Sequence, residues 1–412
     1  MPDILSQGGG REPGPWPRRL VVAAAVLALM AVAIVHYLPR AGKGSASPAA
    51  SPTATPPPPP LADSTAVSGD GATALEPDGI TGPVLSWPGG LRLLASGQQP
   101  AWYWPATGQQ QTIGGLPPRG AGYQVIRVAG GWAVQPLPVA PTVCNACAGS
   151  LRPVYFLADA GRSVTLVGRA DAVAPSADGS LWLTSLPPDA APGRGAATAR
   201  EVSVAGRPLG PVISLPAGYR IVQGTSRGLL LAPTSLASGT ATDKLWDPAA
   251  RRSGRSFANV IAASTTQIAW APPCTARCRV QVLDLTGGRQ LTTELPAASS
   301  VANASFSPDG KFLALELSFG DNDNDGQLAV QLESVSMASG RLTVVPQTWA
   351  SSDALVGFGW PASGDSLVAE LNFTTKTQLA SWRPGASRLA IAALGPAHRP
   401  APLAIGQYSP IP

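Results

Sequence analysis

Histidine is almost absent from this 412-residue chain. The two histidines are His36, inside an apolar run, and His398, in a Pro-rich C-terminal segment. A Ser-His-Asp triad, a Cys-His pair or a histidine-rich metal site needs histidine within the folded part of the chain. No histidine lies between these two, so the sequence excludes those classes of catalytic and metal site from the folded part of the chain. We expect no catalytic residues.

Charged residues are also few, at 13% of the chain, and the formal net charge is only +5. A nucleic-acid surface needs a basic patch or stripe, often interleaved with aromatic side chains. No basic run of this kind is present in the sequence. We therefore expect no nucleic-acid partner.

Long uncharged runs are rare too, and Leu20–Leu38 is the notable one. At ~1.5 Å per residue it is long enough to cross a ~30 Å hydrocarbon layer. The apolar region of a secretory signal is shorter, about 7–15 residues, so we expect an uncleaved transmembrane helix. Basic residues before the run favour a cytoplasmic N-terminus for residues 1–19. Arg18-Arg19 as a twin-arginine export signal is the alternative.

Proline and glycine, in contrast, are abundant, with 44 and 45 residues. Residues 39–79 are rich in Pro, Ala, Ser and Thr, and include five consecutive prolines at Pro56–Pro60. Such a composition cannot bury enough apolar surface to fold, and it predicts a disordered spacer. We expect one folded domain at 80–395 and a C-terminal tail at 396–412.

A repeated hairpin organises that domain. The segment ASFSPDGKFLALEL (304–317) places a Pro308-Asp309-Gly310 turn before an alternating strand in which Leu313, Leu315 and Leu317 share one face. Phe312, Ala314 and Glu316 share the other face. Six further segments resemble it; they are 85–97, 127–137, 173–186, 223–233, 262–272 and 358–371.

Each of these hairpins is followed by a second one with a turn rich in Gly, Asp or Pro. The second hairpins cover 101–113, 154–167, 201–215, 244–254, 280–295, 327–345 and 378–392. The units average about 44 residues, within the ~40–45 of four-stranded propeller blades. The pattern predicts an all-β chain with a seven-bladed β-propeller, with six or eight blades as alternatives.

Tryptophans support this alignment of the units. We place Trp132, Trp182 and Trp270 in second strands of their blades, and Trp102, Trp246 and Trp382 in third strands. Large aromatic side chains at equivalent places are expected to pack between blades.

The SPDG turn and the VLDL-TGG hairpin at 280–295 resemble the repeats of TolB-type and WD-like β-propellers of bacterial envelopes. The resemblance covers roughly residues 84–392. It implies a closed ring of blades that binds other proteins and carries out no chemistry. TolB itself has six blades and an extra N-terminal domain, so its particular partners do not transfer to this chain.

Four cysteines form two close pairs, Cys144 with Cys147 and Cys274 with Cys278. Both pairs are predicted between the second and third strands of their blades. Blades two and five lie too far apart for one four-cysteine zinc site. We therefore expect local structural disulfides in an oxidising compartment, with a redox site as the alternative.

The DNDNDG segment at 321–326 is the candidate metal site. Asp321, Asp323 and Asp325 alternate as in the first half of a calcium loop. The second half is missing, because Leu332 stands where an EF-hand places its glutamate. A solvated polar turn is the alternative, and we expect no other cofactor. This segment is also predicted between second and third strands, so it would share one face of the ring with the cysteines.

Together these patterns predict a non-catalytic scaffold of the bacterial cell envelope. We expect a single-pass protein of the cell membrane with its propeller outside the cytoplasm and an envelope protein as its partner. No obligate homo-oligomer is expected. The alternatives are a cell-wall glycan-binding module and a carboxylate-dependent carbohydrate hydrolase or lyase, because separate blades can supply two acids. The SADGSLW segment (176–182) differs from a sialidase Asp-box because Asp178 and Gly179 are adjacent.

Overall fold

A computed structural model describes most of the domain predicted from the repeats. The described residues are 80, 85–87, 91–96, 98–117, 122–137, 151–186, 195–234, 242–273, 278–296, 299–319, 329–351, 355–361, 364–373, 376–396 and 403–404. The run Leu20–Leu38 and the spacer lie outside them. Within the described part of the chain, no helix is long and apolar enough to span a bilayer.

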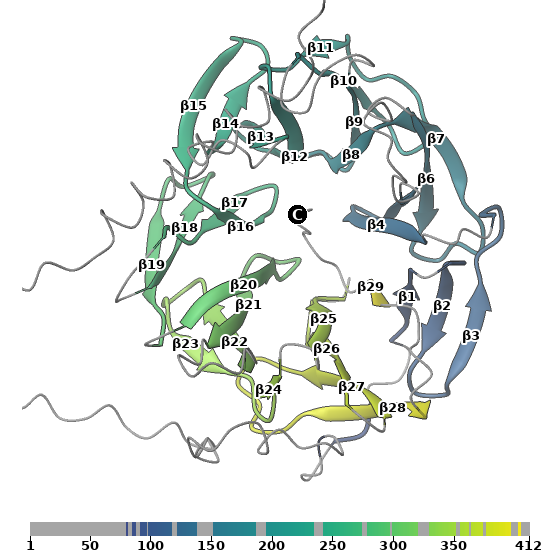
Figure 1. Ribbon diagram of the computed structural model, residues 1–412, viewed down its shortest axis with the longest axis vertical. Coiled ribbons are helices and arrows are strands. Elements are labelled where there is room, and N and C mark those ends of the chain that lie inside the picture. Colours follow the sequence, from purple (N-terminus) through teal and green to yellow (C-terminus); the bar gives the residue numbers. More distant parts are fainter. Residues whose placement is uncertain are drawn as a thin grey trace, which may run out of the picture. The chain divides into compact units, whose positions relative to one another are not determined.

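The described chain is all-β, and its strands form seven antiparallel sheets that follow one another around a centre (Figure 1). Each sheet is one blade with its first strand nearest the centre. The strands of blades 1–4 are β29 (Leu403–Ala404), β1 (Leu93–Ala95), β2 (Ala101–Trp104) and β3 (Gln109–Thr112); β4 (Tyr123–Val128), β5 (Gly131–Pro136), β6 (Arg152–Ala158) and β7 (Thr165–Ala170); β8 (Ala172–Pro175), β9 (Leu181–Ser185), β10 (Thr198–Val202) and β11 (Ile213–Ser214); and β12 (Tyr219–Thr225), β13 (Gly228–Pro233), β14 (Asp243–Asp247) and β15 (Arg252–Phe257).

Blades 5–7 have the same order. Their strands are β16 (Val260–Ala263), β17 (Gln267–Trp270), β18 (Arg279–Asp284) and β19 (Gln290–Glu294); β20 (Ser299–Phe306), β21 (Phe312–Phe319), β22 (Ala329–Ser336) and β23 (Leu342–Val344), with β24 (Ala350–Ser351) also paired to β22; and β25 (Leu355–Gly359), β26 (Leu367–Asn372), β27 (Lys376–Trp382) and β28 (Ala390–Pro396). The predicted seven-bladed β-propeller is confirmed.

The first blade differs from its prediction. Segment 85–97 was expected to supply the first two strands, but it contributes only β1. The innermost strand is β29, from the other end of the chain, with Leu94 paired to Ala404. Leu85 instead forms a parallel bridge to Ala390 of blade 7. Leu403–Ala404 lie in the range assigned to a C-terminal tail, and they belong to the ring.

Apolar clusters close all seven blade interfaces. Because sheet residues alternate between two faces, every blade offers one apolar face to each neighbour. One residue pair represents each interface in turn: Trp102 with Trp132, Val154 with Leu183, Trp182 with Trp246, Leu230 with Ile268, Val282 with Leu315, Leu332 with Leu367, and Leu379 with Leu93. The last pair joins blade 7 to blade 1, so side-chain packing closes the ring as well.

The six aligned tryptophans lie in the strands predicted for them. Each is buried, with 2–8% of its surface exposed, and each belongs to an interface cluster. In β21 the expected alternation also holds: Leu313, Leu315 and Leu317 are fully buried against blade 5, and Ala314 packs toward blade 7. The predicted packing role of these residues is confirmed.

Candidate functional site

The ring has two edges that differ in their connections. Within an antiparallel blade, the connections from first to second and from third to fourth strand leave the same edge, which we name the turn edge. The connections from second to third strand, and those between blades, leave the opposite edge, which we name the loop edge.

All three sites predicted from the sequence belong to the loop edge. Residues 137–151 join β5 to β6, residues 271–278 join β17 to β18, and residues 320–328 join β21 to β22. These are second-to-third connections of blades 2, 5 and 6, so the predicted strand positions are confirmed. The shared edge follows from the strand order of the blades.

The side chains of those sites are mostly outside the described residues. This applies to Cys144, Cys147 and Cys274, and to all three aspartates, Asp321, Asp323 and Asp325. Cys278 is described and directly precedes β18. The pairings of the cysteines and the calcium site stay predictions. Among the side chains that the structure places, no three His, Cys, Asp or Glu residues gather as they would around a metal ion.

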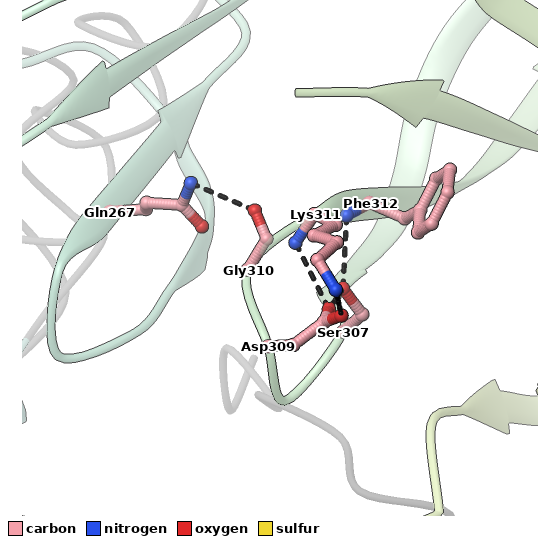
Figure 2. A network of polar contacts seen from close by, with 6 residues as sticks. All are labelled: Gln267, Ser307, Asp309, Gly310, Lys311 and Phe312. Carbon is pink, nitrogen blue, oxygen red and sulfur yellow. Dashed lines mark hydrogen bonds and ion pairs between the residues drawn. The ribbon is translucent and has the colours of Figure 1, made fainter. Parts of the chain in front are cut away.

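The turn edge is described in detail at the SPDG turn of blade 6 (Figure 2). The Ser307 hydroxyl donates to Asp309 Oδ1 at 2.7 Å and accepts from the Phe312 amide at 2.9 Å. The Lys311 ammonium lies 2.9 Å from Asp309 Oδ2. Although partial burial opposes it, hydrogen bonds and charge from Lys311 and Ser307 hold the pKa of Asp309 down at about 2. This carboxylate is ionised, and its partners, Ser307 and Lys311, belong to its own turn.

The same turn is joined to the neighbouring blade. Gln267 at the start of β17 donates from Nε2 to the Gly310 carbonyl at 3.0 Å (Figure 2). Gly310 has a φ of +68°, which L side chains rarely adopt. A Cβ at Gly310 would lie 3.0 Å from Gln267 Oε1. Glycine therefore allows both the turn and the approach of blade 5.

Similar contacts join the first turns of blades 2–7. The Ser226 amide donates to the Thr265 carbonyl at 2.8 Å, from blade 4 to blade 5. A Cβ on Gly179 would lie 2.8 Å from the Ala129 Cβ, one on Gly224 would lie 2.8 Å from the Ser176 Cα, and one on Gly364 would lie 3.5 Å from the Pro308 Cδ. The turn edge is thus a continuous collar of short, closely packed turns.

Replacing Gly310 by alanine tests this collar. We expect a loss of about 2 kcal/mol in the free energy of unfolding, because alanine is strained at positive φ and displaces Gln267. Gly385→Ala is the matched control, since Gly385 has a φ of +85° and nothing within 4 Å of an added Cβ. Its loss should be about 1 kcal/mol, from the backbone alone. Equal losses in urea unfolding would contradict a role for the Gly310–Gln267 contact.

A second polar cluster lies on the first turn of blade 3. The hydroxyls of Ser176 and Ser180 both donate to Glu201 Oε1, and the Ser180 amide donates to Asp178 Oδ1 at 2.9 Å. Hydrogen bonds from the Ser180 side chain and amide lower the pKa of Asp178. The sequence did not point to Glu201, because it belongs to the third strand, 21 residues beyond Ser180.

Three buried glutamates were also missed. Glu316, Glu333 and Glu370 are exposed by only 8%, 1% and 2%. Burial raises the pKa of Glu333 to about 7, and its Oε2 has no hydrogen-bond partner among the described atoms. Burial also raises the pKa of Glu316, although Asn303 donates to its carboxylate at 2.7 Å. The only signal in the sequence was a glutamate within an apolar strand.

These glutamates do not converge on one catalytic pair. Cross-strand partners share a face of a sheet. Glu333 pairs with Leu315, which faces blade 5, and Glu316 pairs with Leu332, which faces blade 7. Glu370 pairs with Leu379 in the interface between blades 7 and 1. The three carboxyl groups thus belong to three different blade interfaces.

Comparison with known proteins shows a similarity of fold and nothing further about this chain. No protein-family model matches the chain, and no curated protein matches its sequence. Similar solved structures include TolB from Acinetobacter baumannii (13% identity, TM-score 0.38, covering 63% of this chain and 64% of that one). Pseudomonas aeruginosa periplasmic gluconolactonase PpgL has 15% identity and a TM-score of 0.45, covering 76% of this chain and 97% of its own. Hydrazine synthase of Kuenenia stuttgartiensis has 12% identity and a TM-score of 0.41, covering 63% and 76%.

Proteins named as enzymes therefore stand beside TolB among these neighbours, and the fold alone does not decide whether this chain is an enzyme. The chain spans less than two thirds of the A. baumannii TolB. Likeness at this level concerns the fold alone. The seven described sheets themselves make this chain an all-β, seven-bladed propeller, a fold consistent with a TolB-type propeller.

Proposed function

We propose that this chain is a non-catalytic binding module whose loop edge holds a protein of the cell envelope. In this proposal Leu20–Leu38 anchors the chain in the cell membrane and the ring lies outside the cytoplasm. The alternatives, a glycan-binding module and a carbohydrate enzyme, are outcomes of the experiment below.

The observation that carries the proposal is the unequal length of the connections at the two edges. The longest loop-edge connections are residues 137–151 and 186–197, with 15 and 12 residues. Turn-edge connections are mostly short, such as residues 129–130 and 226–227, and the longest is residues 203–212, with 10 residues. Hairpin connections usually have about 2–5 residues, and much longer ones are commonly functional. A rigid framework that presents long connections on one side is the usual architecture of a binding surface.

Exposed leucines flank the longest of these connections. Leu137 is 39% exposed just after β5, and Leu151 is 43% exposed just before β6. Large apolar side chains at the rim of a surface are suited to anchor a protein partner.

In this proposal the four cysteines form local disulfides, which persist in an oxidising compartment outside the cytoplasm.

Site-specific photo-crosslinking in intact cells tests the proposal. A photoreactive residue would replace Leu137 or Leu151 at the loop edge, and Lys311 or Thr286 at the turn edge as controls, since both controls are exposed. We expect a discrete protein adduct from the loop-edge positions and none from the controls, read by mass spectrometry. Protein adducts from the controls alone would reverse the edge assignment. Cell-wall fragments on the loop edge would identify a glycan-binding module, and turnover of a glycan by the purified chain would identify an enzyme.

A further inference from the structure

An arginine recurs at the turn between third and fourth strands in six consecutive blades. These arginines, which we name the arginine belt, are Arg162, Arg207, Arg252, Arg289, Arg341 and Arg388 in blades 2–7. The turn of blade 1 has glutamines at this place, at the start of β3. All six belong to the turn edge, so the belt passes through six successive blades, whose order around the ring is seen in Figure 1.

Backbone hydrogen bonds show that the positions are equivalent. The carbonyls of Arg207, Arg289 and Arg341 accept from the amides of Ser203, Asp284 and Ser336 at 2.8, 2.8 and 3.0 Å. Each donor ends or directly follows the third strand of its blade. The closed turn therefore holds the backbone of these three arginines at corresponding places in their blades.

Further contacts hold two belt residues against neighbouring blades. The Gly114 amide of blade 1 donates to the Arg162 carbonyl at 2.8 Å, and Arg289 donates from its guanidinium to the Ala338 carbonyl of blade 6 at 3.0 Å. The belt is thus part of a rigid framework.

No belt arginine forms an ion pair within the described part of the ring. All six arginines are exposed, and the ion pairs there, Arg127–Asp159 and Lys311–Asp309, involve none of them. Nearby aspartates serve their own turns: Asp247 Oδ1 accepts from the amides of Ala249 and Ala250 at 2.9 and 3.0 Å. Asp284 Oδ1 accepts from the Thr286 amide at 2.8 Å. These aspartates keep their negative charge, but neither forms an ion pair with a belt arginine, so the guanidinium groups can still pair with an external anion.

We propose that the turn edge docks on an anionic lipid surface through the arginine belt. A belt that follows one edge through six blades distributes its charges around that edge, and a flat charged surface can meet several of them together. A single peptide or nucleic-acid strand would reach only part of the belt. Clustered basic residues are a known means of adsorption to anionic leaflets.

Exposed aliphatic side chains on the same edge favour lipid over a soluble polyanion. Leu166 is the second residue of β7, and Leu209 and Val212 lie between β10 and β11; they are 56%, 52% and 49% exposed. All three belong to the same turns or strand ends as Arg162 and Arg207. Basic and aliphatic residues on one surface are typical of proteins that lie on a membrane. The inference does not depend on the partner proposed for the loop edge.

Hydrogen exchange of the full-length chain tests the inference. The chain would be reconstituted in nanodiscs of phosphatidylcholine, alone or mixed with phosphatidylglycerol. We expect backbone amides of residues 285–290 and 337–342 to exchange more slowly only in the anionic nanodiscs. High salt should abolish this protection, because it screens exposed charges.

A matched pair of variants separates the belt from total charge. Each arginine near an anionic leaflet strengthens adsorption about fivefold, so Arg289→Gln with Arg341→Gln should weaken it about 30-fold and remove the protection. Arg169→Gln with Arg279→Gln removes the same charge from exposed loop-edge positions and should leave the protection unchanged.

Equal exchange in both kinds of nanodisc would overturn the proposal, as would equal loss in both double variants. Protection that arises only on addition of soluble polyglutamate would assign the belt to an acidic polymer and also overturn it. Incorporation of the chain into both kinds of nanodisc reports on the anchor alone, so failure of the anchor and failure of the belt are distinguishable.

Discussion

Replacing Trp382 by alanine is expected to lower the free energy of unfolding by about 3–5 kcal/mol, the largest effect among the substitutions considered. Trp382 is 2% exposed and packs between blades 6 and 7 with Leu332 and Leu367. Its indole Nε1 donates to the Ala386 carbonyl at 2.8 Å, so the variant also leaves this acceptor unpaired. Equilibrium unfolding in urea measures the effect.

Two control variants show whether interface packing is the cause. Trp382→Phe keeps most of the apolar volume and should cost clearly less than alanine. Leu166→Ala removes an exposed side chain and should change stability by about 0.5 kcal/mol or less. A loss below about 1 kcal/mol for Trp382→Ala would contradict the role assigned to this interface cluster.

Replacing Glu333 by glutamine is expected to stabilise the ring at neutral pH by up to about 3 kcal/mol. The carboxyl is 1% exposed, between Leu315 of β21 and Val344 of β23 on the face toward blade 5. Burial raises its pKa from the ordinary 4.5 to about 7. Glutamine has a similar shape and cannot ionise, so it avoids the cost of a buried charge.

The sign of the pH dependence follows from the raised pKa. Below about pH 4.5 Glu333 is protonated in both states and does not favour unfolding. Between about 4.5 and 7 the unfolded chain loses this proton first, so stability falls as pH rises. Above about 7 both states are ionised and the difference is constant.

Urea unfolding across this pH range checks the prediction. The stabilities of the wild-type chain and Glu333→Gln should be close near pH 4.5 and separate progressively up to pH 7. Subtracting the two curves removes the contribution of other buried acids, such as Glu316 and Asp243, whose pKa values burial also raises. Parallel curves would show that Glu333 ionises freely in the folded ring.

Most of the blade pattern was predictable because its signals are local. The SPDG turn and the alternation of Leu313, Leu315 and Leu317 lie within one hairpin, and they identify two strands and their buried face. The tryptophans confirmed the alignment of the blades. Blade 1 was misassigned because its innermost strand, β29, lies at the other end of the chain, and two residues carry too little pattern to be recognised.

The candidate sites were predictable only as positions along the chain. Strand order placed the cysteine pairs and the 321–326 segment at one edge. The Glu201 cluster and the collar of turns depend on contacts between strands or blades. The hydrophobic periodicity of the sequence does not predict such contacts. The belt arginines are visible in the sequence, but their equivalence needs the bounds of the strands.

The sequence by itself determined the all-β class and the turn chemistry and favoured seven blades, because backbone geometry and side-chain alternation act over a few neighbouring residues. Only the tertiary structure decided which strand completes the first blade, which faces pack together and which carboxyl groups are buried. Those properties depend on residues distant in sequence, which meet only when the last strand pairs with the first blade and each sheet is covered by its neighbours.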